Sequence, residues 1–282
     1  MLKRKFVVTG STSDTSRVVA EKLLSAGHQV TAISRAAGIS VDDQAALTEA
    51  FKGADGAYIM IPFDMKAPDL HRREMEVGAN LAEALEKNKV RRVVLLSGSS
   101  AHLKKGTSLG AALMEDRLDA LNIPELVHLR CCWFMENFFK GLAFVQQAAS
   151  GVFSSGFRGD VATPMIATGD IGQIAANILL EEPFVQPRVR ELLGPRDYTM
   201  KEATQILGAA IGKPDLVYVQ SSYEDAMKGM TAAGVSPSFA EAVTETARSF
   251  NQLQRWALEE RSGQNTTPTT LESFAKEALS RS

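Results

Sequence analysis

The first half of the chain alternates short apolar runs with longer segments whose apolar residues recur at helical spacing. The short runs are rich in valine, leucine and isoleucine, which is typical of strands buried on both faces. Such runs predict strands at 5–9, 29–33, 56–61, 92–96 and 125–129, and the segments between them predict helices at 16–26, 42–51, 66–87 and 107–121. Strands that alternate with helices of this length predict right-handed crossovers and a parallel sheet.

Individual residues predict where several helices begin and end. Gly27 follows the first helical segment and is expected to end it in a left-handed conformation. Pro68 is expected in the first turn of the third helix, where its missing N–H is not needed. Asp170 and Thr199 precede helical patterns in the second half of the chain and are expected to cap them.

The second half of the chain loses the alternation. An apolar and aromatic stretch at 133–150 predicts a helix, and the later pattern predicts helices at 170–180, 199–211 and 271–279 with strands at 189–193 and 216–220. The predicted fold class is α/β, a Rossmann-type doubly wound parallel sheet with a smaller, mixed α/β C-terminal substrate domain. We place the dinucleotide-binding domain at 1–133 and the smaller domain at 134–282, with 166–194 returning to the first. No linker separates them, so direct packing is expected.

Composition narrows the functional classes. The 282 residues carry a formal net charge of −2 and no long basic run, so nothing favours direct nucleic-acid binding. No stretch approaches the ~18 apolar residues of a membrane span, and the N-terminal apolar run is too short for a signal peptide. The two cysteines, Cys131 and Cys132, are adjacent and lack metal-ligand spacing. We therefore expect no metal site, no membrane association and a reducing, cytoplasmic location.

The strongest local signal is the segment 9–16, between the first strand and the first helix. A dinucleotide-binding turn needs a tight turn, close approach of the backbone to the pyrophosphate, and a helix N-terminus facing the anion. Gly10 meets the first need, while Thr12, Ser13 and Ser16 complete the predicted set, with serines where glycines usually stand. Asp14 brings a carboxylate toward the phosphates and should weaken binding unless it points to solvent or caps the helix. A turn merely rich in capping residues is the alternative.

The second predicted strand ends in Ser34 and Arg35, without the acidic residue that binds the ribose 2′-hydroxyl of NAD(H) at this place. A guanidinium can hold a 2′-phosphate through two hydrogen bonds, and the serine hydroxyl can add another. The pair therefore favours NADP(H) over NAD(H) as the cofactor. An ordinary exposed arginine is the alternative.

Several segments in order along the chain resemble the NmrA-like group of atypical short-chain dehydrogenases/reductases. They are Thr9-Gly10-Ser11-Thr12, Ser34-Arg35, Val94-Leu95-Leu96-Ser97, Glu115 with Leu118, the stretch 129–138, Ile166-Ala167, Asp170-Ile171-Gly172 and Gly194-Pro195. The resemblance implies a dinucleotide-binding protein. Enzymes of the group often reduce quinones, enones or imines with NADPH, whereas other members act as redox sensors through partner proteins.

Two departures from the wider superfamily bear on catalysis. No tyrosine is followed four residues later by lysine, and Ala111 stands one helical turn before Glu115, where some relatives carry a lysine. No general acid–base pair is therefore evident. Hydride transfer itself needs only positioning of cofactor and acceptor, and a reduced quinone is a stable phenolate that water can protonate. The missing pair is thus more compatible with a quinone than with a simple ketone.

Further candidates follow the third and fourth strands, at the edge where ligands bind in such sheets. Tyr58 and Ile59 are expected to be buried strand, whereas three residues are expected beside the cofactor riboses: Ile61, Pro62 and Phe63. Ser97 is expected at the cofactor and Ser99 at the substrate, with a plain turn as the alternative. His102 is the candidate proton donor, against an ordinary solvated histidine.

The segment after the fifth strand supplies the substrate candidates. Phe134, Glu136 and Asn137 are expected to line an apolar pocket, with core packing of the second domain as the alternative. Cys131 and Cys132 are interpreted as buried rather than catalytic, because no histidine is placed to activate them.

Three functional hypotheses follow. The first is an NADPH-dependent oxidoreductase that acts on a quinone or similar conjugated acceptor, with an apolar or aromatic small molecule as substrate. The second is a dinucleotide-binding regulator that acts without turnover through a protein partner. The third is a Rossmann domain that binds no dinucleotide, because of Ser13 and Asp14. We favour them in this order, and a homo-oligomer stays open.

Overall fold

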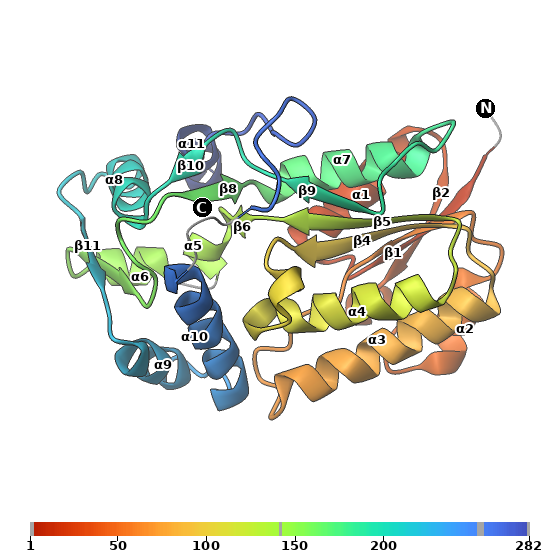
Figure 1. Cartoon of the computed structure of the whole chain (residues 1–282), viewed down its shortest axis with the longest axis horizontal. Helices are drawn as coiled ribbons and strands as arrows, with labels where there is room; N and C mark the ends of the chain where they lie inside the picture. Colours follow the sequence, from red (N-terminus) through yellow and green to blue (C-terminus); the bar gives the residue numbers. More distant parts are fainter. Residues whose placement is uncertain (1–2, 141–142, 253–256, 281–282) are drawn as a thin grey trace.

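The computed structural model describes residues 3–140, 143–252 and 257–280, and shows a six-stranded sheet joined to a smaller unit of short strands and helices (Figure 1). The sheet runs in the order β2-β1-β3-β4-β5-β9, and every neighbouring pair is parallel. Its strands are β1 Lys5–Thr9, β2 Gln29–Ile33, β3 Gly56–Ile59, β4 Arg92–Gly98, β5 Glu125–Cys131 and β9 Val189–Leu192. The predicted Rossmann-type α/β sheet is confirmed.

Helices cover both faces of the sheet (Figure 1). One face carries α1 (Asp14–Ser25) and α7 (Thr168–Leu180), and the other carries α2 (Gln44–Phe51), α3 (Leu70–Lys87) and α4 (Leu109–Ala120). Alternate residues of β1 divide between the two cores, since Phe6 and Val8 pack with α1 and α7 while Val7 packs with α2, α3 and α4. Burial on both faces explains why three successive residues of β1 are apolar.

The helix starts correct two predictions. Asp69 accepts a hydrogen bond from the Arg72 N–H and caps α3, so the helix begins four residues later than predicted and Pro68 lies before it. Helix α7 begins at Thr168, so Asp170 does not cap it; its carboxylate accepts from the N–H and hydroxyl of Thr269, at 3.0 and 2.8 Å. A carboxylate can accept hydrogen bonds from a distant loop as well as from a helix N-terminus, and the local sequence does not distinguish the two.

Two other predicted helix ends are confirmed. Gly27 has φ +85° at the end of α1, a conformation that a residue with a Cβ adopts only at a cost. Thr199 accepts from the Glu202 N–H at 3.1 Å and caps α8 (Met200–Ala210).

The sheet is short on the β2 side. The classic dinucleotide-binding order, 3-2-1-4-5-6, has two strands beyond strand 1 there. Here β2 is the edge, because the chain forms only the 3₁₀ turn η1 (Arg35–Ala37) and helix α2 before β3 returns beside β1. The loop 34–43 therefore follows the end of the edge strand β2, with no further strand beside it in the sheet.

The smaller unit contains short strands around an aromatic core. Its remaining elements are β6 Trp133–Phe134, α5 Asn137–Lys140, α6 Phe144–Ala148, β7 Val152–Ser155, β8 Thr163–Ile166, β10 Asp197–Tyr198, β11 Val217–Gln220, α9 Tyr223–Ala232, α10 Pro237–Gln252 and α11 Leu271–Ser280. The predicted continuous helix at 133–150 is wrong, because Trp133 and Phe134 pair with β8 and the Met135 N–H donates to the Ile166 carbonyl at 2.9 Å. Residues 141–142 of that prediction lie outside the described residues.

The two units pack directly, as expected. Helix α10 lies against the 3₁₀ turn η3 (Gly106–Ser108) that leads into α4, and the Thr246 hydroxyl accepts from the Thr107 N–H at 2.9 Å. The segment 265–267 runs beside Leu193, which exchanges backbone hydrogen bonds with Asn265 and Thr267. The domain boundary predicted at residue 133 stays a prediction. Within 166–194, β9 joins the large sheet and α7 packs against it. Across the described residues no helix combines the length and apolarity needed to cross a bilayer.

Candidate functional site

The turn between β1 and α1 is built around Gly10 and Met60. Gly10 has φ +61°, and a Cβ placed on it would lie 2.5 Å from the Met60 sulfur. The Ser13 and Ser16 hydroxyls lie 3.3 and 3.4 Å from the same sulfur. The thioether thus fills the inner side of the turn, and the sequence pattern gave no signal for this role of Met60.

The two serines at glycine positions have structural partners. The Ser13 hydroxyl accepts from the Ser16 N–H at 3.2 Å and caps α1, while the Ser16 hydroxyl donates to the Thr9 carbonyl at 2.8 Å. Ser16 is fully buried and Thr12 is exposed at the tip. Among the described residues, no acceptor is present for the N–H groups of Thr12 and Thr15. These N–H groups are what an anion at a helix N-terminus would use.

Two carboxylates lie near that helix N-terminus. Asp14 opens α1 within 4.0 Å of the Arg17 guanidinium. Glu136 accepts from the Thr168 N–H at 3.0 Å and from its hydroxyl at 2.6 Å, so it holds the start of α7. Burial raises the pKa of Glu136, and the charge of Asp14 raises it further. Glu136 thus joins the smaller unit to α7 through these hydrogen bonds, and its place at the substrate stays a prediction.

The end of β2 forms a compact polar loop. The Ser11 hydroxyl donates to the Ser34 hydroxyl at 2.8 Å, which joins the first and second strand ends. Ser34 in turn accepts from the Ala37 N–H at 3.1 Å and caps η1. Arg35 is exposed and makes no side-chain hydrogen bond or ion pair within the described ranges. An arginine that makes no ion pair, next to a helix start where two N–H groups have no acceptor, fits a phosphorylated ribose.

The end of β3 faces α10 of the smaller unit. Tyr58 and Ile59 are fully buried, as expected for strand residues, and burial raises the pKa of Tyr58. Ile61 and Pro62 are half-buried, whereas Phe63 is 53% exposed and packs edge-on against Phe239 with ring centroids 5.7 Å apart.

Backbone contacts reinforce this approach of α10. The Ser236 N–H donates to the Met65 carbonyl at 2.8 Å, and the Leu70 N–H donates to the Ser238 hydroxyl at 2.9 Å. The start of α10 therefore bridges to the loop between β3 and α3. The sequence offered no local signal for this contact, because its two sides are more than 160 residues apart.

The end of β4 is tied to helix α4. The Ser97 hydroxyl donates to Glu115 at 2.5 Å, and Arg130 of β5 donates to both oxygens of the same carboxylate. Ser99 is buried, and its carbonyl lies 3.0 Å from Nδ1 of the exposed His102. Ser97 therefore braces β4 against α4, while His102 sits at the surface of the same loop.

The tyrosines offer no acid beside this edge. Tyr58 lies within the sheet core, and the other three bond within the smaller unit. Tyr198 donates to Glu272 at 3.4 Å, Tyr218 donates to the Phe157 carbonyl at 2.6 Å, and Tyr223 accepts from Asn251 at 2.8 Å. No tyrosine–lysine pair thus faces the strand ends.

The end of β5 buries both cysteines. Cys131 and Cys132 are each 3% exposed, and burial raises the pKa of both thiols. Their thiolate forms are disfavoured, which agrees with the interpretation as packing residues. Phe134 packs partly against the sheet core, and Asn137 opens α5 half-buried.

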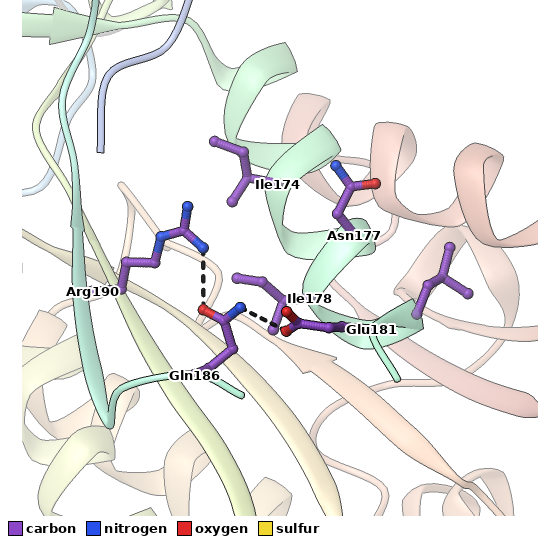
Figure 2. Close-up of a pocket in the computed structure, with 7 residues that line it drawn as sticks. Ile174, Asn177, Ile178, Glu181, Gln186 and Arg190 are labelled. Carbon is purple, nitrogen blue, oxygen red and sulfur yellow. Dashed lines mark hydrogen bonds between the residues drawn. The ribbon is translucent and has the colours of Figure 1, made fainter. Parts of the chain in front are cut away.

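A hollow of about 390 Å³ lies elsewhere, between α7 and β9 (Figure 2). Figure 2 shows Gln186 bridging Arg190 and Glu181 within it, through hydrogen bonds of 3.1 and 2.6 Å. The end of α7 adjoins Arg92 at the start of β4, so this hollow lies toward the amino ends of the strands. Ligands of open α/β sheets bind at the opposite edge, and the candidate site is there. No group of three metal-ligating side chains occurs in the described part of the chain.

Two curated proteins are similar to this chain in sequence. Festuclavine dehydrogenase easG of Aspergillus fumigatus is 28% identical over 178 residues, which are 62% of this chain and 57% of that enzyme, so the match spans less than two thirds of its length. The uncharacterized oxidoreductase YesF of Bacillus subtilis is 25% identical over 249 residues, 85% of this chain and 82% of YesF.

Two solved structures share the fold over nearly the whole chain. The NADPH-dependent quinone oxidoreductase QOR2 of Escherichia coli, complexed with NADPH, superposes with a TM-score of 0.76 at 21% identity, covering 97% of this chain and 99% of its own. The triphenylmethane reductase of Citrobacter sp. gives 0.75 at 20% identity, covering 98% and 99%. The sequence profile of the NmrA-like family matches residues 2–275. The chain therefore belongs to the NmrA-like family.

Proposed function

We propose that this protein is an NAD(P)H-dependent oxidoreductase that binds NADP(H) and transfers hydride to a quinone or similar conjugated acceptor. The observation that carries the proposal is the joint geometry of two strand ends. The N–H groups of Thr12 and Thr15 have no acceptor at the start of α1, and Arg35 beside them makes no ion pair or side-chain hydrogen bond, within the described residues. The two N–H groups can hold the pyrophosphate, and Arg35 can hold the 2′-phosphate.

The related proteins support the same cofactor and reaction class. QOR2 is named as NADPH-dependent and was solved with NADPH, and the Citrobacter reductase was solved with NADP(H). Festuclavine dehydrogenase is named for a dehydrogenase activity, and YesF is named as an oxidoreductase. These names share the oxidoreductase class, and the two solved structures add NADP(H) as the cofactor. The quinone acceptor is proposed from the residues of this chain.

The residues at the carboxyl ends of the strands favour an acceptor that needs no protein acid. NADPH supplies a hydride when it is bound, and the protein supplies orientation and electrostatics. The reduced form of a quinone is a phenolate that takes its proton from water, whereas an alkoxide needs a donor in place. Phe63 and Phe239 offer an apolar, partly exposed wall that fits a planar aromatic acceptor. His102, with Nδ1 on the Ser99 carbonyl, is the proposed auxiliary proton donor.

The second candidate is a regulator that binds NADP(H) without turnover. The absence of a tyrosine–lysine pair at the strand ends favours it, because the described residues then place no such general acid beside a bound acceptor. Such a protein would act through a protein partner.

Turnover separates the two candidates. Oxidation of NADPH by purified protein should be followed with benzoquinone, naphthoquinone and a simple ketone as acceptors. The oxidoreductase predicts turnover with the quinones and little with the ketone. Tight NADPH binding without turnover on any acceptor would instead favour the regulator. The contact of Phe63 and Phe239 with the acceptor is tested by Phe63→Ala, which should raise KM for the larger quinone. Met75→Ala on α3 is the control, because Met75 is also an exposed apolar residue.

A further inference from the structure

Asp42 lies at the same sheet edge as Ser34 and Arg35, in the loop 34–43 that follows β2. Arg73, on the first turns of α3, binds both oxygens of its carboxylate; the Nη2–Oδ2 distance is 2.9 Å, and Nη1 bonds Oδ1. The Ser40 hydroxyl donates to Oδ2 at 3.2 Å. The carboxylate is therefore held by a two-point ion pair with its orientation fixed.

The pair is charged and accessible to solvent. The hydrogen bonds from Arg73 lower the pKa of Asp42, and the charge of Arg35 lowers it further, so the carboxylate is ionised at neutral pH. The bond to Asp42 likewise raises the pKa of Arg73. The side chains of Asp42 and Arg73 are 53% and 29% exposed. An exposed ion pair adds little to stability, so the fold alone gives this geometry little purpose.

The neighbouring cofactor site offers a functional reason for the Arg73–Asp42 ion pair. A carboxylate near the end of the second strand binds the ribose 2′-hydroxyl in NAD(H) sites, and it repels a 2′-phosphate. Asp42 is close enough to Arg35 for their charges to interact, so it would oppose the phosphate that Arg35 attracts. With Arg73 bound to it, its charge is compensated and its oxygens are occupied.

We propose that Arg73 sets the coenzyme preference of this protein by neutralising Asp42, which leaves Arg35 able to hold the 2′-phosphate of NADP(H). Without Arg73, the loop presents a free carboxylate and turns toward the 2′-hydroxyl of NAD(H). Arg73 is here a positioning residue that acts through Asp42. The inference rests on the proposed function, because it requires a dinucleotide bound across the ends of β1 and β2.

The test is a double-mutant cycle on binding. NADPH and NADH are titrated calorimetrically into wild type, Arg73→Met, Asp42→Asn and the double variant. Arg73→Met should weaken NADPH binding by about tenfold, the size of one like-charge contact near a surface, and leave NADH binding equal or tighter. Adding Asp42→Asn should restore NADPH affinity to within about threefold of wild type. Raised salt should shrink these differences.

Each other outcome has a definite meaning. If the double variant binds NADPH as weakly as Arg73→Met, or if Arg73→Met leaves the preference unchanged, Arg73 does not act through Asp42 and the inference fails. If wild type binds neither dinucleotide, the proposed function itself fails. Arg72→Met is the matched control, because Arg72 pairs with Glu76 on an exposed face of α3. Arg73→Lys, which keeps the charge but not the two-point bond, should give a smaller loss and serves if Arg73→Met does not fold.

Discussion

Replacing Gly10 by alanine should destabilise the turn between β1 and α1 for two separable reasons. The first is backbone strain, because φ +61° costs a residue with a Cβ about 1–2 kcal/mol. The second is overlap, because the new Cβ would lie 2.5 Å from the Met60 sulfur and 2.9 Å from its Cγ. Overpacking of this kind costs about 1–3 kcal/mol when a flexible side chain must move. Together they predict a loss of about 2–5 kcal/mol.

Urea denaturation of four proteins separates the two terms: wild type, Gly10→Ala, Met60→Ala and the double variant. In the Met60→Ala background only the backbone strain remains, so Gly10→Ala should cost about 1–2 kcal/mol there. An equal cost of Gly10→Ala in both backgrounds would refute the packing of Met60 against the turn. Binding of NADPH should also weaken in Gly10→Ala, because the backbone can no longer approach the phosphates.

Three further predictions concern the surroundings of the site. Burial raises the pKa of Glu136, so the folded state holds a proton that the unfolded state loses, and stability should fall as the pH rises from about 4.3 toward the folded-state pKa. Glu136→Gln should lose that decline, and an unchanged pH dependence of unfolding would contradict the assignment. Glu191 is 1% exposed and accepts hydrogen bonds from the Leu258 and Glu259 N–H groups at 3.1 and 2.7 Å. Glu191→Ala should lower the free energy of unfolding, measured in denaturant, by about 3 kcal/mol. A loss under about 1 kcal/mol would show that these two hydrogen bonds do not hold the segment 258–259. Cys131 and Cys132 should resist a thiol reagent at neutral pH until the protein unfolds, and rapid labelling of the native protein would show that they are not packed as described.

The large sheet could be predicted from the sequence because it depends on local patterning. Most strands of this sheet are short, mainly apolar runs between helical segments, and nearly all residues of β1, β3 and β4 are buried or half-buried. The short strands β6 and β8 left no such signal. Trp133 and Phe134 belong to an aromatic stretch that suits a helix equally well, and only pairing with a strand thirty residues later decides the outcome.

The turns that carry the candidate site could be predicted from the sequence, but their contacts could not. Gly10 and Arg35 follow the ends of strands, which are local features of the sequence. The partners that fix the site come from distant segments: Met60 beneath Gly10, Thr168 on Glu136, and Arg73 on Asp42. These contacts depend on how helices and loops meet in space, and one sequence carries no record of such meetings.

The most direct test of the account is calorimetric titration of NADPH, NADP⁺ and NADH into wild type and Arg35→Ala. Arg91→Ala is the control, because Arg91 is exposed just before β4, at the opposite edge of the sheet. We predict NADP(H) binding by wild type and the control, a loss of at least about tenfold in Arg35→Ala, and little change for NADH. Absence of dinucleotide binding, or equal affinity of wild type and Arg35→Ala for NADPH, would contradict it.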